Sequence, residues 1–187
     1  ASAAAWRRSS SGEPGGATPA AADYGYARPE IHRTMLLDAV RTDAFRDALR
    51  EVIRPGDTVI DMGAGSGVLC MFAAEAGAAE VHGIECSAIY KTARRVLDLN
   101  GWSSVQLHQG DAESLALPAR AQVIVSEWLG YFVYADGMYP AFAALRDRCL
   151  VPGGKVIPAE VEVCVAPMED RDPRGHAYWY GRPYGFD

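Results

Sequence analysis

The stretch TVIDMGAGSGVLCMFAAEAGA, residues 58–78, decides the fold of this chain. Its first part, TVIDMG, is a short run rich in apolar residues, which is typical of a buried strand. Glycines follow at positions 63, 65 and 67, and glycine lets the backbone turn tightly and approach a ligand closely. The remainder, GVLCMFAAEAG, predicts an apolar helix that ends at Gly77, a residue type common just after helix ends. A strand, a glycine-rich turn and a helix in this order begin a βαβ unit.

The same alternation of strands and helices continues toward the C-terminus. The predicted strands are EVHGIE (80–85), SVQLH (104–108), AQVIVSE (121–127) and KVIPAEVEVCVAP (155–167). The predicted helices are 31–40 and 43–53 with a cap at Thr42, SAIYKTARRVLDLNG (87–101) with a cap at Ser87, and YPAFAALRDRCL (139–150) before a turn at Pro152-Gly153-Gly154. Strands that alternate with helices indicate parallel pairing. We therefore expect an α/β fold with a doubly wound, mostly parallel sheet, preceded by N-terminal helices.

Composition and charge exclude several classes of protein. The chain has 187 residues, which suits one domain, and no apolar run approaches the roughly 20 residues that span a bilayer. Its net charge of −6 argues against direct nucleic-acid binding, which requires a basic surface. The four cysteines form no C-x-x-C pair and the four histidines are scattered, so no metal site is expected. Each cysteine lies in or beside an apolar stretch, which predicts buried thiols in a reducing compartment.

An acid precedes the glycine turn and another ends the next strand. Glu85 comes 22 residues after Gly63, where an acid in such folds accepts hydrogen bonds from ribose hydroxyls. The spacing G-x-G-x-G, preceded by Asp61, differs from the G-x-G-x-x-G of dinucleotide sites. An acid there disfavours a phosphate and suits a cationic amino group. The pattern resembles motif I of class I S-adenosylmethionine (SAM) methyltransferases; a NAD site and a purely structural turn are the alternatives.

Two further acids flank an apolar and aromatic run, SEWLGYFVYADGM, residues 126–138. Glu127 and Asp136 stand nine residues apart after the strand AQVIVS. A guanidinium stays protonated at physiological pH, and carboxylates bind its planar fork in a bidentate manner. Two carboxylates could therefore orient one guanidinium nitrogen toward a sulfonium methyl group. Tyr131 and Tyr134 could line a slot for the aliphatic stem, or could simply pack in the core.

The segment SEWLGY (126–131), with its second acid, resembles the double-acid loop of protein arginine methyltransferases. The segments VRTDAFR (40–46), DMGAGSGVLCMFAAEAGA (61–78), GIECSAI (83–89) and YGFD (184–187) resemble other segments of that family in the family's order. The resemblance implies a Rossmann-like class I SAM-dependent methyltransferase fold. It also implies SAM as cofactor and methyl transfer to a guanidino nitrogen of arginine in protein substrates, either Arg/Gly-rich or histone-like.

The resemblance also assigns roles to individual residues. It implies that Arg41 binds the SAM carboxylate, that Asp61, Gly63 and Gly65 line the methionine portion, that Glu85 binds the ribose, that Glu113 meets the adenine amino group, and that Met138 lies beside the cofactor. It places His32, Met35 and Tyr131 at the substrate slot, and Glu127 and Asp136 as the catalytic acids. From the residues alone, the methionines could equally be core filler and His32 a structural histidine.

The chain departs from the family pattern at several points. Asp136 stands where the family has glutamate, so its carboxylate is one methylene shorter. The aromatic motif that opens the family's core is reduced to DYGY, residues 23–26. We expect weak or altered activity. The alternatives are a methyltransferase acting on a small amine or guanidino compound, and a non-catalytic SAM-binding fragment.

We expect three regions in the chain. Residues 1–22 are predicted to be a low-complexity tail or a remnant transit peptide, 23–158 the SAM-binding domain with its N-terminal helices, and 159–187 the start of a truncated β-barrel substrate domain. The family's barrel carries its dimerisation arm, so the resemblance implies a homodimer for the full-length form. It also implies residence in the cytoplasm, the nucleus or both.

Overall fold

A single parallel sheet organises the chain, whose computed structural model describes residues 25–117, 120–130 and 137–167. The strands are β1 (Thr58–Met62), β2 (Glu80–Glu85), β3 (Gln106–Gln109), β4 (Ala121–Val125) and β5 (Leu150–Ile157). The helices are α1 (Pro29–Leu37), α2 (Ala39–Val52), α3 (Val68–Glu75), α4 (Tyr90–Leu99) and α5 (Tyr139–Cys149). The five strands have the order β3-β2-β1-β4-β5, and every pair is parallel.

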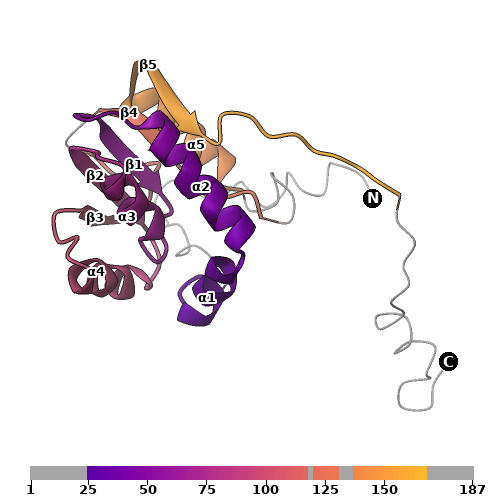
Figure 1. Ribbon diagram of the computed structural model, residues 1–187, viewed down its shortest axis with the longest axis horizontal. Helices are drawn as coiled ribbons and strands as arrows, with labels where there is room; N and C mark the ends of the chain where they lie inside the picture. Colours follow the sequence, from indigo (N-terminus) through magenta and orange to yellow (C-terminus); the bar gives the residue numbers. More distant parts are fainter. Residues whose placement is uncertain (1–24, 118–119, 131–136, 168–187) are drawn as a thin grey trace, which may run out of the picture.

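Helices cover both faces of this sheet, so the predicted doubly wound α/β fold is confirmed (Figure 1). On one face, α2, α3 and α4 bury a core that includes Leu49, Cys70 and Leu97. On the other face, α5 buries Phe142 and Leu145 against the opposite side of the same strands. The chain winds outward from β1 in both directions, which creates a switch point between β1 and β4. In such sheets a ligand crevice forms at the carboxyl ends of the strands beside the switch point.

Gly83 in β2 allows α3 to lie close to the sheet. A Cβ atom at this position would lie 2.7 Å from Leu107 Cδ1 and 2.8 Å from Cys70 Sγ. Both distances are shorter than real Cβ contacts, so any larger residue would force the helix away from the strands. This close packing brings Cys70 of α3 within reach of β1.

The helix starts differ from those predicted. Asp38, not Thr42, is the N-cap of α2, and its side chain accepts a hydrogen bond from Arg41 N at 3.2 Å. An aspartate at this position satisfies a free amide of the first turn, so the helix begins four residues earlier than predicted. Ser87, the predicted cap of the next helix, is not its N-cap residue either: Ile89 is, and α4 begins three residues later than predicted, at Tyr90. Ser87 instead accepts a hydrogen bond from Ile89 N at 3.3 Å in the turn that precedes α4.

The last strand also differs from the prediction. Strand β5 includes the predicted turn Pro152-Gly153-Gly154 as an irregularity, because the register with β4 shifts between Ala121 and Val123. It ends at Ile157, and residues 158–167 form no strand, so the strand predicted over 155–167 is too long by ten residues. Proline at 158 has no N–H to donate to a ladder, which explains the stop. The predicted barrel start at 159–187 lies mostly outside the described residues.

Two of the four cysteines are not buried as predicted. Cys70 and Cys149 are buried, whereas Cys86 and Cys164 are exposed. Cys86 follows the last residue of β2, and Cys164 lies after β5 in residues 159–167, all of which are exposed. An apolar neighbourhood in the sequence did not predict burial at these two positions, because burial depends on which elements pack over a residue in the fold.

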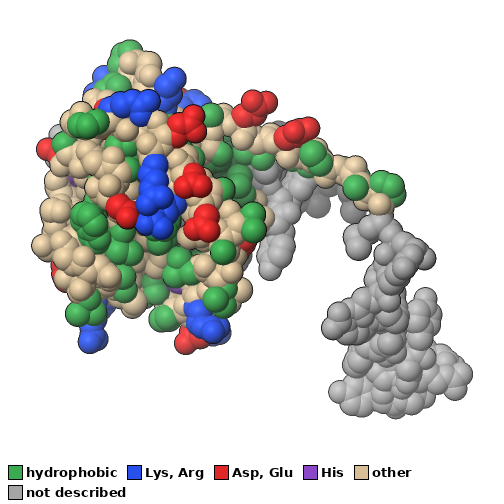
Figure 2. All heavy atoms as spheres, in the orientation of Figure 1, with side chains coloured by type: hydrophobic (Ala, Val, Ile, Leu, Met, Phe, Trp, Pro, Cys, Tyr) green, Lys and Arg blue, Asp and Glu red, His purple; other side chains and the backbone are tan. Residues whose placement is uncertain are grey.

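The surface over α2 and α3 carries charges of both signs (Figure 2). Arg46 and Arg50 of α2 approach the Glu75 carboxylate of α3 at 2.8 and 3.6 Å. Within the described residues, no helix has the length and apolar character that crossing a membrane requires.

Candidate functional site

The glycine turn lies at the carboxyl end of β1 and is bound to β2. Gly63 N and Ala64 N both donate to the Ile84 carbonyl at 2.9 Å. Gly63 and Gly65 have φ values of +77° and +53°, which disfavour any residue with a Cβ. The turn therefore exposes backbone rather than side chains at the edge of the sheet where the crevice is expected.

Backbone amide groups hold Glu85, at the end of β2, in one orientation. Its Oε2 accepts from Gly65 N at 2.9 Å and its Oε1 from Ser87 N at 2.7 Å. The residue is 7% exposed. A carboxylate has about four lone-pair sites, so each oxygen can still accept one donor from a ligand. The prediction that Glu85 binds a ribose fits this arrangement.

Asp61, on β1, is a fully buried acid with one unpartnered oxygen. Its Oδ2 accepts a hydrogen bond from the Cys70 thiol at 3.2 Å, and its Oδ1 has no partner among the described residues. Burial raises the pKa of Asp61 to about 7; the nearby Glu85 charge adds to this, and the Cys70 hydrogen bond opposes it. Burial also raises the pKa of the Cys70 thiol, which therefore stays protonated and able to donate. Because the pKa of Asp61 lies near neutrality, its carboxyl group could ionise when a cation reached the unpartnered Oδ1.

Two side chains from distant elements pack on the glycines. A Cβ at Gly65 would lie 2.9 Å from His32 Cε1, and one at Gly63 would lie 3.2 Å from Met138 Cε. His32 comes from α1 and is buried, with its Nε2 2.7 Å from the Tyr26 carbonyl oxygen. Met138 is the N-cap residue of α5. The structure thus places His32, predicted at the substrate slot, against a glycine predicted to line the cofactor.

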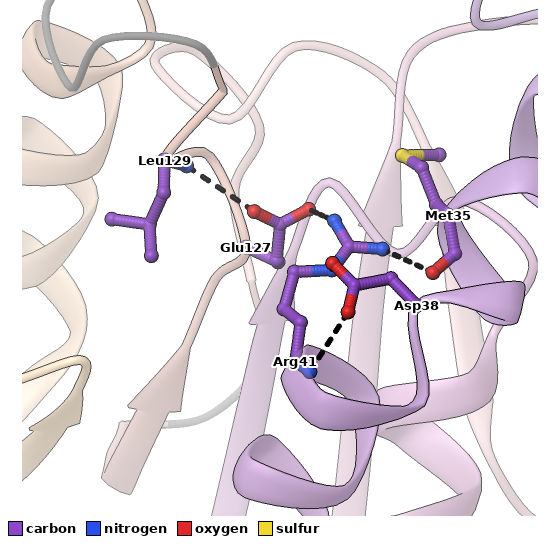
Figure 3. Close-up of polar contacts among 5 residues, drawn as sticks. All are labelled: Met35, Asp38, Arg41, Glu127 and Leu129. Atoms are coloured by element: carbon purple, nitrogen blue, oxygen red, sulfur yellow. Dashed lines mark hydrogen bonds and ion pairs between the residues drawn. The ribbon is translucent and has the colours of Figure 1, made fainter. Parts of the chain in front are cut away.

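Arg41, on α2, and Glu127, in the loop after β4, form an ion pair (Figure 3). Arg41 Nη1 lies 2.6 Å from Glu127 Oε2, and Arg41 Nη2 donates to the Met35 carbonyl. The other oxygen, Oε1, accepts from Leu129 N at 3.3 Å. The side chains are only 26% and 21% exposed, so the pair is partly shielded from water. Glu127 is therefore seen binding a guanidinium, although that guanidinium belongs to the chain itself.

Ser126 fixes the start of the loop that carries Glu127. Its Oγ donates to the Met62 carbonyl at 2.6 Å, and its N donates to the Ile157 carbonyl at 3.0 Å. These bonds join the ends of β1, β4 and β5 immediately before Glu127. Sequence reasoning assigned no role to Ser126 or to Cys70. Ser126 directly precedes the strand-end acid Glu127, which is a signal that could have identified it. Cys70 lies nine residues after Asp61, and no pattern in the sequence connects the two.

The remaining predicted residues differ in how far the structure describes them. Glu113 is exposed in the turn after β3, and its carboxylate has no partner within the described residues. Tyr131 and Asp136 lie outside the described residues, so the geometry of the acid pair stays a prediction. Within the described ranges, no group of three or more His, Cys, Asp or Glu side chains could hold a metal ion.

Comparison with known proteins identifies relatives of this arrangement. The family model described as "Methyltransferase domain" matches residues 59–154. The chain is 38% identical over 175 residues to protein arginine N-methyltransferase 1 of Dictyostelium discoideum, covering 89% of this chain and 51% of the relative. It is 37% identical over 149 residues to protein arginine N-methyltransferase 6 of Xenopus laevis, covering 78% of this chain and 44% of the relative. The chain thus spans about half the length of these curated relatives.

The solved structures that this chain resembles include protein arginine methyltransferases as well. A Trypanosoma brucei PRMT1 enzyme-prozyme heterotetrameric complex with AdoHcy matches with a TM-score of 0.67 and 36% identity, over 70% of this chain and 42% of that chain. Arabidopsis thaliana protein arginine methyltransferase 10 matches with a TM-score of 0.68 and 34% identity, over 71% of this chain and 39% of that chain.

Proposed function

Because this chain belongs to the methyltransferase-domain family, and within it to the protein arginine N-methyltransferases, we propose that it transfers a methyl group from SAM to a guanidino nitrogen of arginine in protein substrates. The observation that carries the proposal is the contact of Glu127 with the Arg41 guanidinium at 2.6 Å. It supports the proposal because Glu127 is only partly exposed and stands at the crevice edge of the sheet, where a substrate guanidinium would need an anion.

The residues around the glycine turn fit SAM as the cofactor. The unpartnered, buried Oδ1 of Asp61 suits the cationic amino group of the methionine portion. The remaining lone pairs of Glu85 suit ribose hydroxyls. The lack of a Cβ atom at Gly63 and Gly65 lets Met138 and His32 pack directly on the turn beside that site. Bound there, SAM supplies an electrophilic methyl group on a sulfonium. The Arg41 guanidinium would hold the carboxylate of the same portion.

Positioning and electrostatics are the chain's contribution to the chemistry. Glu127 holds the planar substrate guanidinium and stabilises its charge, and Asp136 is the second anion of the pair. The reacting nitrogen loses one proton as it gains the methyl group, and the acid pair is the acceptor that the chain offers. Arg41 and the amide of Leu129 use one lone pair on each oxygen of Glu127, which leaves others for the substrate.

Substrates and partners follow as part of the same proposal. Arg/Gly-rich or histone-like segments present an arginine on a flexible backbone that can enter a narrow slot. The Trypanosoma brucei relative is described as a heterotetrameric complex; for the full-length form of this protein we propose a homodimer. For the localisation of the protein, we propose the cytoplasm, the nucleus or both, because proteins with such arginine-bearing segments occur there.

Transfer of labelled methyl groups from SAM tests the function directly. We expect label on Arg/Gly-rich peptides and not on a matched panel of small amines and guanidino compounds. Label on the small molecules alone would assign the chain to a small-molecule methyltransferase. Binding of SAM in calorimetry with no transfer to any acceptor would show a non-catalytic binding module. Absence of SAM binding would contradict the whole proposal.

Lengthening Asp136 by one methylene is expected to raise activity. Aspartate withdraws the carboxylate by ~1.5 Å relative to glutamate, and a displacement of about 1 Å can cost ~10²-fold in rate. Asp136→Glu should therefore increase turnover on an arginine peptide by at least about tenfold. The measurement is initial-rate methyl transfer, with Asp136→Asn as the control that removes the charge and keeps the length. Equal turnover in the Glu variant and the unaltered protein would show that the shorter side chain is not what limits the reaction.

A further inference from the structure

We propose that Arg148 is a positioning residue that holds the turn after β3 so that Glu113 meets the adenine amino group; this rests on the proposed SAM site. The guanidinium of Arg148, on α5, donates to three backbone carbonyls of that turn. The distances are 2.7 Å to Glu113 O, 2.7 Å to Ala112 O and 3.3 Å to Leu115 O. No ion pair of Arg148 occurs within the described parts of the chain.

The turn is held at its other end by Asp111. Asp111 Oδ1 accepts from Glu113 N at 2.9 Å, and Asp111 O accepts from Leu115 N at 2.8 Å. This is one turn of helix-like backbone, and such a turn leaves its last carbonyls without internal partners. A cation that donates to those carbonyls completes the turn from its C-terminal end.

The turn that Arg148 holds is also connected to Glu85, the residue proposed to bind the ribose. Gly110 N donates to the Glu85 carbonyl at 3.1 Å, so the turn begins where β2 ends. Below the turn, Ala112 and Leu115 pack against the core on the α5 face of the sheet. Arg148 therefore joins α5, the turn and the end of β2 into one unit. Two exposed acids lie on that unit: the Asp111 carboxylate accepts from Glu113 N, whereas the Glu113 carboxylate has no partner among the described residues.

The second arginine of α5 provides a matched control. Arg146 lies two residues earlier and, among the residues that the structure describes, pairs only with its neighbour Asp147, at 2.8 Å from Nε to Oδ1. It touches none of the carbonyls of the turn that Arg148 binds. Arg146→Ala thus removes an equal charge from the same helix without releasing the turn.

The test compares two ligands that differ at one position of the base. S-adenosylhomocysteine (SAH) carries the amino group that Glu113 would accept from; S-inosylhomocysteine carries an oxygen there. A hydrogen bond to a charged group is worth about tenfold or more in affinity. We expect calorimetry to show a clear preference of the unaltered protein for SAH. Arg148→Ala should weaken SAH binding about tenfold and leave binding of the inosine ligand within about twofold. Arg148→Lys should restore part of the preference, and Arg146→Ala should keep all of it.

Each other outcome contradicts a specific statement. If Arg148→Ala keeps the full preference for SAH, or weakens both ligands equally, Arg148 does not position Glu113. The same follows if Arg148→Ala still lowers the preference in a Glu113→Ala background, since effects that act through Glu113 cannot add there. If the unaltered protein binds both ligands equally, Glu113 does not read the base. Failure of the unaltered protein to bind SAH at all would instead contradict the proposed function.

Discussion

Replacing Glu127 with glutamine is expected to lower methyl transfer to an arginine peptide about 10²- to 10³-fold. The amide keeps the shape of the side chain but removes the charge that the guanidinium faces, and it turns one acceptor into a donor. Arg41, which now lies 2.6 Å from Glu127, would lose that carboxylate, yet it keeps Asp38 at 3.7 Å and the Met35 carbonyl as an acceptor. We therefore expect SAH affinity to stay within about threefold of the unaltered protein.

Two controls separate catalysis from structure in this experiment. Glu51→Gln changes an exposed acid on α2 and should leave both rate and affinity unchanged. Arg41→Ala should weaken SAH binding, because it removes the cation expected to hold the cofactor carboxylate. If the pair of Arg41 and Glu127 only ties α2 to the loop after β4, Glu127→Gln and Arg41→Ala would lower thermal stability alike. Glu127→Gln would then not lower the methyl-transfer rate selectively, and Arg41→Ala would not lower SAH affinity selectively.

Replacing Asp61 with asparagine is expected to remove a large part of the pH dependence of stability. Burial raises the pKa of Asp61 from 3.8 to about 7 in the folded state, so the folded protein keeps this proton over a range where the unfolded chain has lost it. The free energy of unfolding therefore falls as the pH rises from about 4 to about 7, by up to about 4 kcal/mol, and this effect is constant above pH 7. Between about pH 5.5 and about pH 8 the loss is about 2 kcal/mol, and Asp61→Asn should abolish it.

Denaturant unfolding at the two pH values measures this effect. Asp47→Asn, at a residue whose side chain is 77% exposed, is the matched control and should follow the unaltered protein. Parallel curves for the unaltered protein and Asp61→Asn would show that Asp61 is ionised in the fold at all pH values tested. In calorimetry, Asp61→Asn should also weaken SAH about tenfold at about pH 8, since the ligand's amino group loses its anion.

The sequence predicted the fold because its signals are local. Backbone preference and hydrophobic period are properties of neighbouring residues. They predict the strand at residues 58–62, the glycine turn after it and the apolar helix that ends before Gly77. The same rules gave β2 its bounds, Glu80–Glu85, without error. They failed where a local pattern had competing solutions: Asp38 replaced Thr42 as a cap, and a strand-like run after Ile157 formed no strand because Pro158 ended the ladder.

The sequence by itself thus determined the alternation of strands and helices, the glycine turn, and the acids at the strand ends, together with the family they resemble. Only the tertiary structure decided which groups meet: Cys70 with Asp61, Arg41 with Glu127 across 86 residues, and Arg148 with carbonyls 33 to 36 residues away. The physical reason is that local propensity fixes the path of each element, whereas a contact between elements depends on how the layers pack. Packing at Gly83, for example, sets how near α3 comes to β1, and nothing within either element specifies that distance.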